Sequence, residues 1–165
     1  ELMIQPTIYK IIENENGGFL AIMAKPVAGE WIEDEFAGLA DLGVQTLVSL
    51  LEIAETREVG LEDEQALCKK NFIDFIHHPT PDRYVPDDVQ SFKAMVDELF
   101  KRFENGQGVA VHCRAGIGRS GITTIAVLVR YGLTVDHAIS LVSQARGIPV
   151  PDTGEQIDWL YDHFG

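Results

Sequence analysis

One segment of nine residues constrains this chain more than any other: His112-Cys113-Arg114-Ala115-Gly116-Ile117-Gly118-Arg119-Ser120. An apolar run at 108–111 precedes it, and an apolar segment with helical character follows it at 121–131. A strand, a tight loop and a helix in this order direct backbone N–H groups at an anion bound on the helix N-terminus. A cysteine at the start of such a loop lies where these groups favour the thiolate. Arg119 has the planar guanidinium that binds two oxygens of a phosphate at once.

Strands and helices are predicted to alternate along the rest of the chain. Apolar runs at 7–12 and 19–24 predict a hairpin, and buried strands are expected at 44–51, 72–76 and 108–112. Helices are expected at 31–42, 62–70, 88–103, 119–131, 135–146 and 153–164, with a proline-rich loop at 77–87. This order predicts an α/β fold with a mostly parallel sheet flanked by helices, in one domain spanning 1–165. Ligands of such folds bind beyond the carboxyl ends of the strands, where Cys113 stands.

Charge and cysteine content limit the partners and the compartment. The net charge of −13 argues against nucleic acid or an anionic membrane as a partner. The two cysteines, Cys68 and Cys113, do not indicate a disulfide scaffold, so a reducing cytoplasmic setting fits better. The sequence has no apolar run of the roughly 20 residues that a membrane helix needs, and residues 1–6 lack the features of a signal peptide. We therefore expect a cytoplasmic monomer.

The pattern H-C-x5-R-S of residues 112–120 resembles the signature of the cysteine-dependent protein tyrosine phosphatases. The compact size is similar to the dual-specificity type. Segments 31–35 and 60–64 are similar to cyclin-dependent-kinase-inhibitor-3-like phosphatases and their small prokaryotic relatives. The resemblance extends from about Phe19 to the C-terminus. It implies a protein-tyrosine-phosphatase-like fold, a phosphorylated protein as substrate, and hydrolysis of phosphotyrosine, with phosphoserine and phosphothreonine as further candidates, without a metal or other cofactor.

The loop residues themselves supply most of the required chemistry. Phosphate monoester hydrolysis needs a nucleophile, donors for the equatorial oxygens and a proton for the leaving oxygen. Cys113 is expected to attack and form a phosphocysteine, while Ser120 donates a hydrogen bond to the sulfur and eases its departure. The phosphate is expected to bind the Arg119 guanidinium and the backbone N–H groups of Arg114, Ala115, Gly116, Ile117, Gly118 and Arg119. The two loop glycines keep side chains out of the way and permit positive φ.

The resemblance implies roles for two residues around this loop, Asp82 and His112. Family members place an aspartate on a mobile loop about thirty residues before the cysteine, and Asp82 holds that position here. We expect it to protonate the leaving oxygen and then to deprotonate the attacking water. His112 is expected to orient the loop and not to act as an acid. Asp87 and Asp88, which precede a predicted helix, suit capping better.

The sequence leaves two possible roles of Gln156 open. Segment 152–156 resembles the loop whose glutamine positions the hydrolytic water in tyrosine phosphatases, but the family has a glutamine where this chain has Asp152. A glutamine near the start of a helix also serves as a cap. The adjacent His77 and His78 lack a third ligand at suitable spacing, so no metal site is expected.

Three other functions remain open. A sulfurtransferase or arsenate reductase also uses a loop thiolate, but the low-molecular-weight phosphatases and related reductases carry this loop near the N-terminus, whereas Cys113 lies two-thirds along the chain. A phosphatase of inositol phosphates or phosphoinositides would share the mechanism. Relatives that act on phosphoinositides carry two basic residues within the loop, whereas Arg114 is the basic one here and Ile117 is apolar. A non-catalytic phosphoprotein-binding module would have lost the nucleophile or the acid, and this chain retains both.

Overall fold

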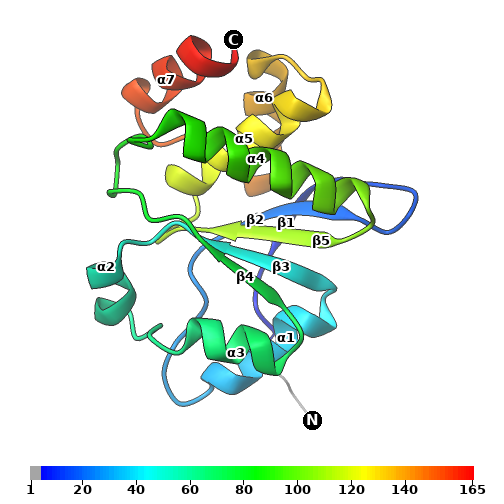
Figure 1. Ribbon diagram of the computed structural model, residues 1–165, viewed down its shortest axis with the longest axis vertical. Coiled ribbons are helices and arrows are strands. Elements are labelled where there is room, and N and C mark those ends of the chain that lie inside the picture. Colours follow the sequence, from blue (N-terminus) through cyan, green and yellow to red (C-terminus); the bar gives the residue numbers. More distant parts are fainter. Residues whose placement is uncertain (1–4) are drawn as a thin grey trace.

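A five-stranded sheet runs through the middle of the protein, with helices packed on both of its faces (Figure 1). The computed structural model describes residues 5–165, so most of segment 1–6, on which the signal-peptide expectation depends, lies outside the described residues. The sheet has the order β1-β2-β5-β3-β4, in which β1 is antiparallel to β2 and the other neighbouring pairs are parallel. Its strands are β1 (Tyr9–Glu13), β2 (Phe19–Met23), β3 (Val44–Ser49), β4 (Asp74–His77) and β5 (Gly108–His112). The predicted α/β fold with a mostly parallel sheet is confirmed.

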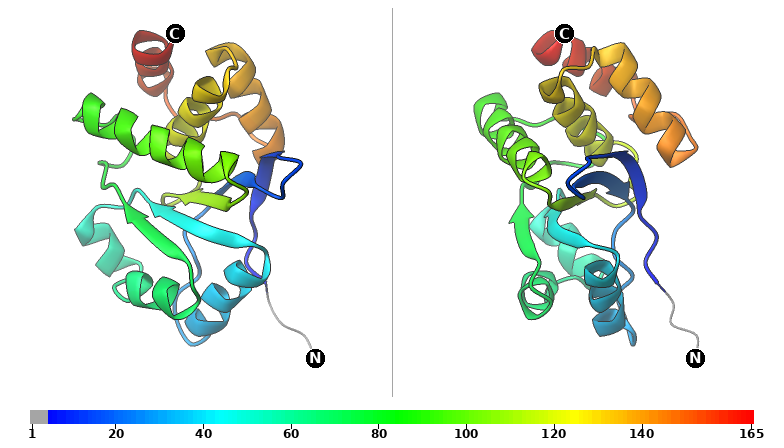
Figure 2. Two further views of the ribbon diagram at one scale, coloured as in Figure 1. Left: turned by 45° about the vertical axis from the view of Figure 1, so that its right-hand side comes forward. Right: turned by 90° about the vertical axis from the view of Figure 1, so that its right-hand side faces the viewer.

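The helices form a layer on each side of the sheet (Figure 2). One side carries α4 (Val89–Glu104), α5 (Arg119–Tyr131), α6 (Val135–Arg146) and α7 (Gly154–Phe164). The other side carries α1 (Ile32–Asp41) and α3 (Glu64–Lys70), and the short α2 (Ile53–Glu58) lies near the carboxyl ends of the strands (Figure 1). Among residues 5–165, no helix combines the length and the apolar character needed to cross a bilayer.

Alternating side chains of the central strands fill two separate cores. Val109 and Val111 of β5 pack under α4 and α5, whereas Ala110 between them faces the opposite layer. Leu20 and Ile22 of β2 follow the same alternation. Successive side chains of a strand point to opposite faces, and a strand covered on both faces is apolar throughout. This burial fixes β5 at the centre of the sheet, and with it the position of Cys113 at its carboxyl end.

Three local expectations are corrected. The helix α2 was not predicted, because its residues Ile53–Glu58 carry few apolar side chains, and a capping box between Glu52 and Glu55 supports it instead. The strand expected at 72–76 begins at Asp74, because Phe72 adopts a positive φ of 59° and is 94% exposed in a turn. Cys68 lies in a segment predicted to be helical, where a half-buried side chain is expected, but in α3 it is fully buried in the core.

Candidate active site

The nucleophile loop connects the end of β5 to the start of α5. Among the described residues, the backbone N–H groups of 114–118 donate to no backbone carbonyl, which leaves them available to an anion. Gly116 has a φ of 75°, and a Cβ on it would lie 2.6 Å from the backbone of Met23. A side chain at this position would therefore both strain the loop and clash with β2.

Cys113 is buried at the base of this loop and contacts Ser120. Its Sγ lies 3.2 Å from the Ser120 Oγ, and the two residues are 3% and 0% exposed. Ser120 is in the first turn of α5, so its hydroxyl and the helix N-terminus face the same sulfur. A hydroxyl donor and the positive end of a helix dipole both stabilise a thiolate over a thiol.

Arg119 is held by a carboxylate that the sequence analysis did not single out. Its Nη1 and Nη2 donate to Oε1 and Oε2 of Glu55 at 2.6 and 3.0 Å, and Nη1 also donates to the carbonyl oxygen of Thr80 at 2.8 Å. The buried Nε is the exception, since it has no hydrogen-bond partner among residues 5–165. An unpaired buried N–H is costly. The guanidinium is thus fixed on one edge and keeps a donor free for a bound oxyanion.

Burial and ion pairing together set the protonation of this pair. Burial raises the pKa of Glu55, but the hydrogen bonds from Arg119 and from the backbone of Glu52 outweigh it and bring the pKa below its ordinary value. Burial disfavours the charged form of Arg119, whereas the hydrogen bond to Glu55 and the nearby negative charges of Cys113 and Asp82 raise its pKa. Both groups are therefore charged at neutral pH.

Asp82 lies at the mouth of the site. Its Oδ1 is 3.2 Å from the Arg119 Nη2, and its side chain is 57% exposed. The neighbouring Arg83 donates to Asp152 at 2.7 Å, which ties the loop that carries Asp82 to the segment before α7. Asp88, by contrast, caps α4 by accepting a hydrogen bond from the Ser91 N–H, as its position predicted.

His112 lies behind the loop and not in its mouth. Its Nδ1 is 3.0 Å from the Cys113 carbonyl oxygen, which accepts the hydrogen bond, and its Nε2 is 2.6 Å from Oε2 of Glu64. Both His112 and Glu64 are almost completely buried. The ring therefore orients the backbone of the nucleophile, and Glu64 fixes the ring.

Gln156 is buried beside Gly118 and forms a cap. Its Oε1 accepts from the N–H groups of Asp152 and Thr153, both at 3.1 Å, and its Nε2 donates to the carbonyl of Tyr84 at 3.1 Å. A Cβ on Gly118 would lie 3.0 Å from this Nε2. The side chain thus joins α7, the Asp82 loop and the nucleophile loop, and its Nε2 retains one N–H.

Arg146, at the end of α6, supports the loop from outside. Its Nε donates to the Gly116 carbonyl and its Nη2 to the Ala115 carbonyl, each at 3.0 Å, while the guanidinium stacks on Tyr9 at 4.5 Å. Because these hydrogen bonds hold the two carbonyl groups toward the outside of the loop, the backbone N–H groups of the loop face inward. Sequence reasoning assigned no site role to Glu55, Glu64 or Arg146, because no local pattern connects them with Cys113, although Glu64 ends the segment 60–64 that resembles the phosphatases.

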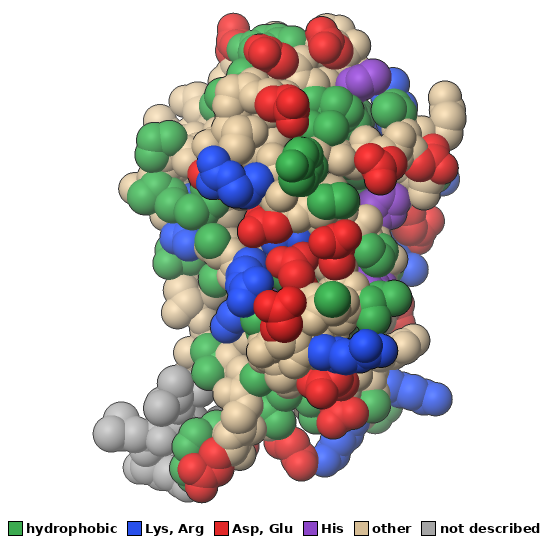
Figure 3. All heavy atoms as spheres, turned by 90° about the vertical axis from the view of Figure 1, so that its left-hand side faces the viewer, with side chains coloured by type: hydrophobic (Ala, Val, Ile, Leu, Met, Phe, Trp, Pro, Cys, Tyr) green, Lys and Arg blue, Asp and Glu red, His purple; other side chains and the backbone are tan. Residues whose placement is uncertain are grey.

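The surface around this site is mixed in charge. Figure 3 views the protein from the side at which the parallel strands end. Near the middle of this view, carboxylates are grouped around basic side chains. Arg114 is part of this surface, with its Nη1 3.8 Å from Glu55 and 3.9 Å from Glu58. A surface of this kind offers both charges to a substrate.

Known proteins share this chain's sequence pattern. A family model described as "Polymorphic toxin system, DSP-PTPase phosphatase" matches residues 21–133. The chain belongs to this family of compact dual-specificity cysteine phosphatases. Cyclin-dependent kinase inhibitor 3 of Sus scrofa is 26% identical over 127 residues, which cover 66% of this chain and 59% of the relative. The phosphatase chain thus spans about three fifths of the length of that relative.

Solved structures share the fold of this chain. Kinase associated phosphatase (KAP), with its catalytic site cysteine substituted by serine, aligns with a TM-score of 0.85 at 20% identity, over 98% of this chain and 95% of that chain. Tk-PTP in its active form aligns with a TM-score of 0.78 at 25% identity, over 96% of each chain. The predicted resemblance to dual-specificity phosphatases is confirmed.

Proposed function

We propose that the protein hydrolyses phosphotyrosine in protein substrates through a phosphocysteine intermediate. One observation carries this proposal most directly. Among residues 5–165, the Arg119 Nε is buried without a hydrogen-bond partner, and the backbone N–H groups of the loop that holds Cys113 donate to no backbone carbonyl. A phosphate supplies the oxygens that these donors lack, and the free donors are arranged around the sulfur that would attack it.

In the first step, Sγ of Cys113 attacks phosphorus, so that the S–P bond forms while the bond to the leaving oxygen breaks. Asp82 gives its proton to that oxygen, and the product alcohol or phenol departs. Arg119 and the N–H groups of 114–119 bind the equatorial oxygens, whose charge they neutralise as the phosphoryl group moves. The position of Asp82 above Arg119 supports this role.

In the second step, water attacks the phosphocysteine and Asp82 accepts its proton. The S–P bond breaks, inorganic phosphate forms, and the departing thiolate accepts a hydrogen bond from Ser120, which is 3.2 Å away. Gln156 is our candidate for positioning the water, because its Nε2 lies next to Gly118 and keeps one N–H. The intermediate requires a reduced sulfur, so a reducing compartment such as the cytoplasm suits the reaction.

Hydrolysis of p-nitrophenyl phosphate and of a phosphotyrosyl peptide tests the proposal. We expect turnover by the wild type, no measurable turnover by Cys113→Ser, and near-normal turnover by Cys68→Ala, which removes the other thiol. Acid quenching during turnover should leave one phosphate on the peptide that contains Cys113, as read by mass spectrometry. Turnover that persists in Cys113→Ser would assign the nucleophile to another residue.

A substrate panel tests the class of phosphate. Phosphoseryl and phosphothreonyl peptides, an inositol phosphate and a phosphoinositide are compared with the phosphotyrosyl peptide by kcat/KM. We expect the phosphotyrosyl peptide to have the highest value, because the loop has Arg114 as its only basic residue between Cys113 and Arg119 and carries Ile117 instead of a second one. A preference for the inositol compounds would replace the protein substrate while leaving the mechanism intact. Tight binding of phosphopeptides without turnover would instead indicate a binding module.

A further inference from the structure

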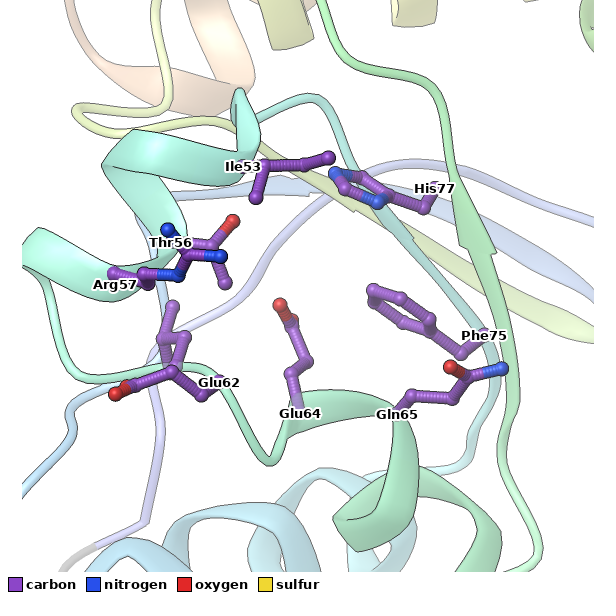
Figure 4. Close-up of a pocket in the computed structure, with 9 residues that line it drawn as sticks. Ile53, Thr56, Arg57, Glu62, Glu64, Gln65, Phe75 and His77 are labelled. Carbon is purple, nitrogen blue, oxygen red and sulfur yellow. The ribbon is translucent and has the colours of Figure 1, made fainter.

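A second pocket lies between α2, α3 and β4, behind the nucleophile loop (Figure 4). Its volume is about 310 Å³, enough for a small organic molecule. Thr56 of α2, Gln65 of α3 and Phe75 of β4 line three of its sides. Cys113, Arg119 and Asp82 do not line it. The pocket is therefore distinct from the proposed catalytic site.

Glu64 gives this pocket an unused hydrogen-bond acceptor. Its Oε2 contacts His112, but its Oε1 is buried and has no partner anywhere in the described part of the chain. The residue is 2% exposed, and Figure 4 shows its carboxylate directed between α2 and β4 toward the middle of the pocket. A buried carboxylate oxygen that lacks a donor is unfavourable, because the hydrogen bonds that it makes with water in the unfolded chain are not replaced. A ligand that brings an N–H group to Oε1 removes this cost.

The lining specifies the rest of the ligand. Apolar groups from Ile53, Leu61 and Phe75 lie beside two carboxylates, those of Glu62 and Glu64. The lining has two basic residues, Arg57 and His77, of which His77 already contacts the Leu51 carbonyl through its Nε2, and the whole chain has a net charge of −13. The field in the pocket therefore favours a cation with an apolar body.

We infer that this pocket binds a small organic cation, an amine or amidine on an aromatic or aliphatic body, whose N–H groups donate to Oε1 of Glu64. The ring of such a ligand lies against Phe75. Ile53 is 61% exposed at the edge of the pocket, so its side chain can move aside as the charged group enters. The Glu64 carboxylate thus contacts His112 through Oε2 and accepts a hydrogen bond from the ligand through Oε1.

Benzamidine is the probe, and the neutral benzamide, which has nearly the same shape, is its control. Both are titrated into the whole protein while backbone ¹H–¹⁵N shifts are recorded. Benzamidine should shift the amides of α2, α3 and β4 saturably, and benzamide should bind at least about tenfold more weakly, because the neutral amide cannot form a hydrogen bond between opposite charges with Glu64. Binding that ignores the charge, or the absence of saturable shifts, would overturn the inference.

Two substitutions on α3 locate the ligand. Gln65→Trp fills the pocket from an exposed position and should weaken benzamidine binding about tenfold or more. Ala66→Trp adds the same side chain at the next exposed position, outside the pocket lining, and should leave binding unchanged. Equal binding by both variants, or displacement of benzamidine by saturating orthovanadate, would place the ligand elsewhere and refute the assignment. The titration uses no turnover, so its outcome is independent of the proposed phosphatase reaction.

Discussion

The substitution Glu55→Gln tests how much the reaction depends on the support of Arg119. Glu55 accepts two hydrogen bonds from the guanidinium, at 2.6 and 3.0 Å, from a position that is 7% exposed. Glutamine has nearly the same shape, keeps one acceptor and replaces the other with an NH2 group that faces the guanidinium. The variant therefore removes the charge and one hydrogen bond while it leaves the packing of α2 largely in place.

The expected loss follows from the geometry. A hydrogen bond to a charged group contributes about 1.5–3 kcal/mol, and about 1.4 kcal/mol corresponds to a tenfold change in rate. Arg119 keeps its contacts with the Thr80 carbonyl and Asp82 in the variant, so its orientation is weakened and not abolished. We therefore expect kcat/KM to fall by about 10- to 100-fold.

Steady-state hydrolysis of p-nitrophenyl phosphate measures this loss. Glu58→Gln is the matched control, because it makes the same change on the same helix at an exposed residue that does not contact Arg119. Its kcat/KM should stay within about twofold of the wild type, as surface substitutions usually cost little. Thermal unfolding of both variants shows that they remain folded at the assay temperature. A folded Glu55→Gln protein with wild-type kcat/KM would refute the argument that this ion pair prepares Arg119.

The same pair predicts a pH dependence of stability. The folded-state pKa of Glu55 lies below its ordinary value of 4.5, so its contribution is fully present above that value and is lost as the pH falls through the folded pKa. The wild type should thus lose its stability advantage over Glu55→Gln below about pH 4.5. Urea unfolding of both proteins at pH 7 and at several acidic values measures the difference. An advantage that grows on acidification would contradict the assigned direction.

Three further perturbations test the rest of the site. With a substrate whose alcohol is a poor leaving group, Asp82→Ala should lower kcat by about 10²–10⁴-fold, which is the usual contribution of acid–base catalysis. Asp87→Ala should leave kcat unchanged. A loss below tenfold in Asp82→Ala would assign the acid role to another carboxylate. Gly116→Ala should destabilise the protein by about 1–3 kcal/mol in urea unfolding, because its Cβ meets the backbone of β2 in a loop with positive φ; an unchanged midpoint would contradict that clash. Burial and the charge of Glu64 raise the pKa of Cys68 to about 12, so iodoacetate at pH 7 should label Cys113 alone, as read by peptide mass spectrometry. Comparable labelling of Cys68 would show that it is not held as a buried thiol.

The parts of the structure that were predicted depend on local patterns. The apolar run before Cys113 predicted a buried central strand, and the stripe of apolar residues between 88 and 103 predicted α4, which is observed at Val89–Glu104. The continuous apolar run of β5 and the period-3.6 apolar stripe of α4 are properties of a few consecutive residues. The spacing of Cys113 and Arg119 is equally local, so the centre of the site could be inferred without any contact information.

The parts that were missed depend on contacts between distant segments. Glu55 is 64 residues from Arg119, and Glu64 is 48 residues from His112. Neither carboxylate differs in its immediate sequence from the many acidic residues of this chain, which has 26 Asp and Glu. Only the packing of α2 and α3 at the ends of β3 and β5 makes them buried partners, and burial is what gives such partners their energetic weight.

These distant contacts explain how the acid and the arginine can act together. The Arg119 guanidinium donates to the Thr80 carbonyl and lies 3.2 Å from Asp82, and these two residues are in the same loop. A displacement of that loop would therefore move Asp82, the proposed acid, and remove a hydrogen-bond acceptor from Arg119, the proposed phosphate-binding side chain, at the same time. Gln156 holds the loop through Tyr84 and packs against Gly118, so a third segment shares the constraint. The proposed proton transfer and phosphate binding thus depend on one connected set of hydrogen bonds, which forms only when the strands of the sheet have brought their carboxyl ends together.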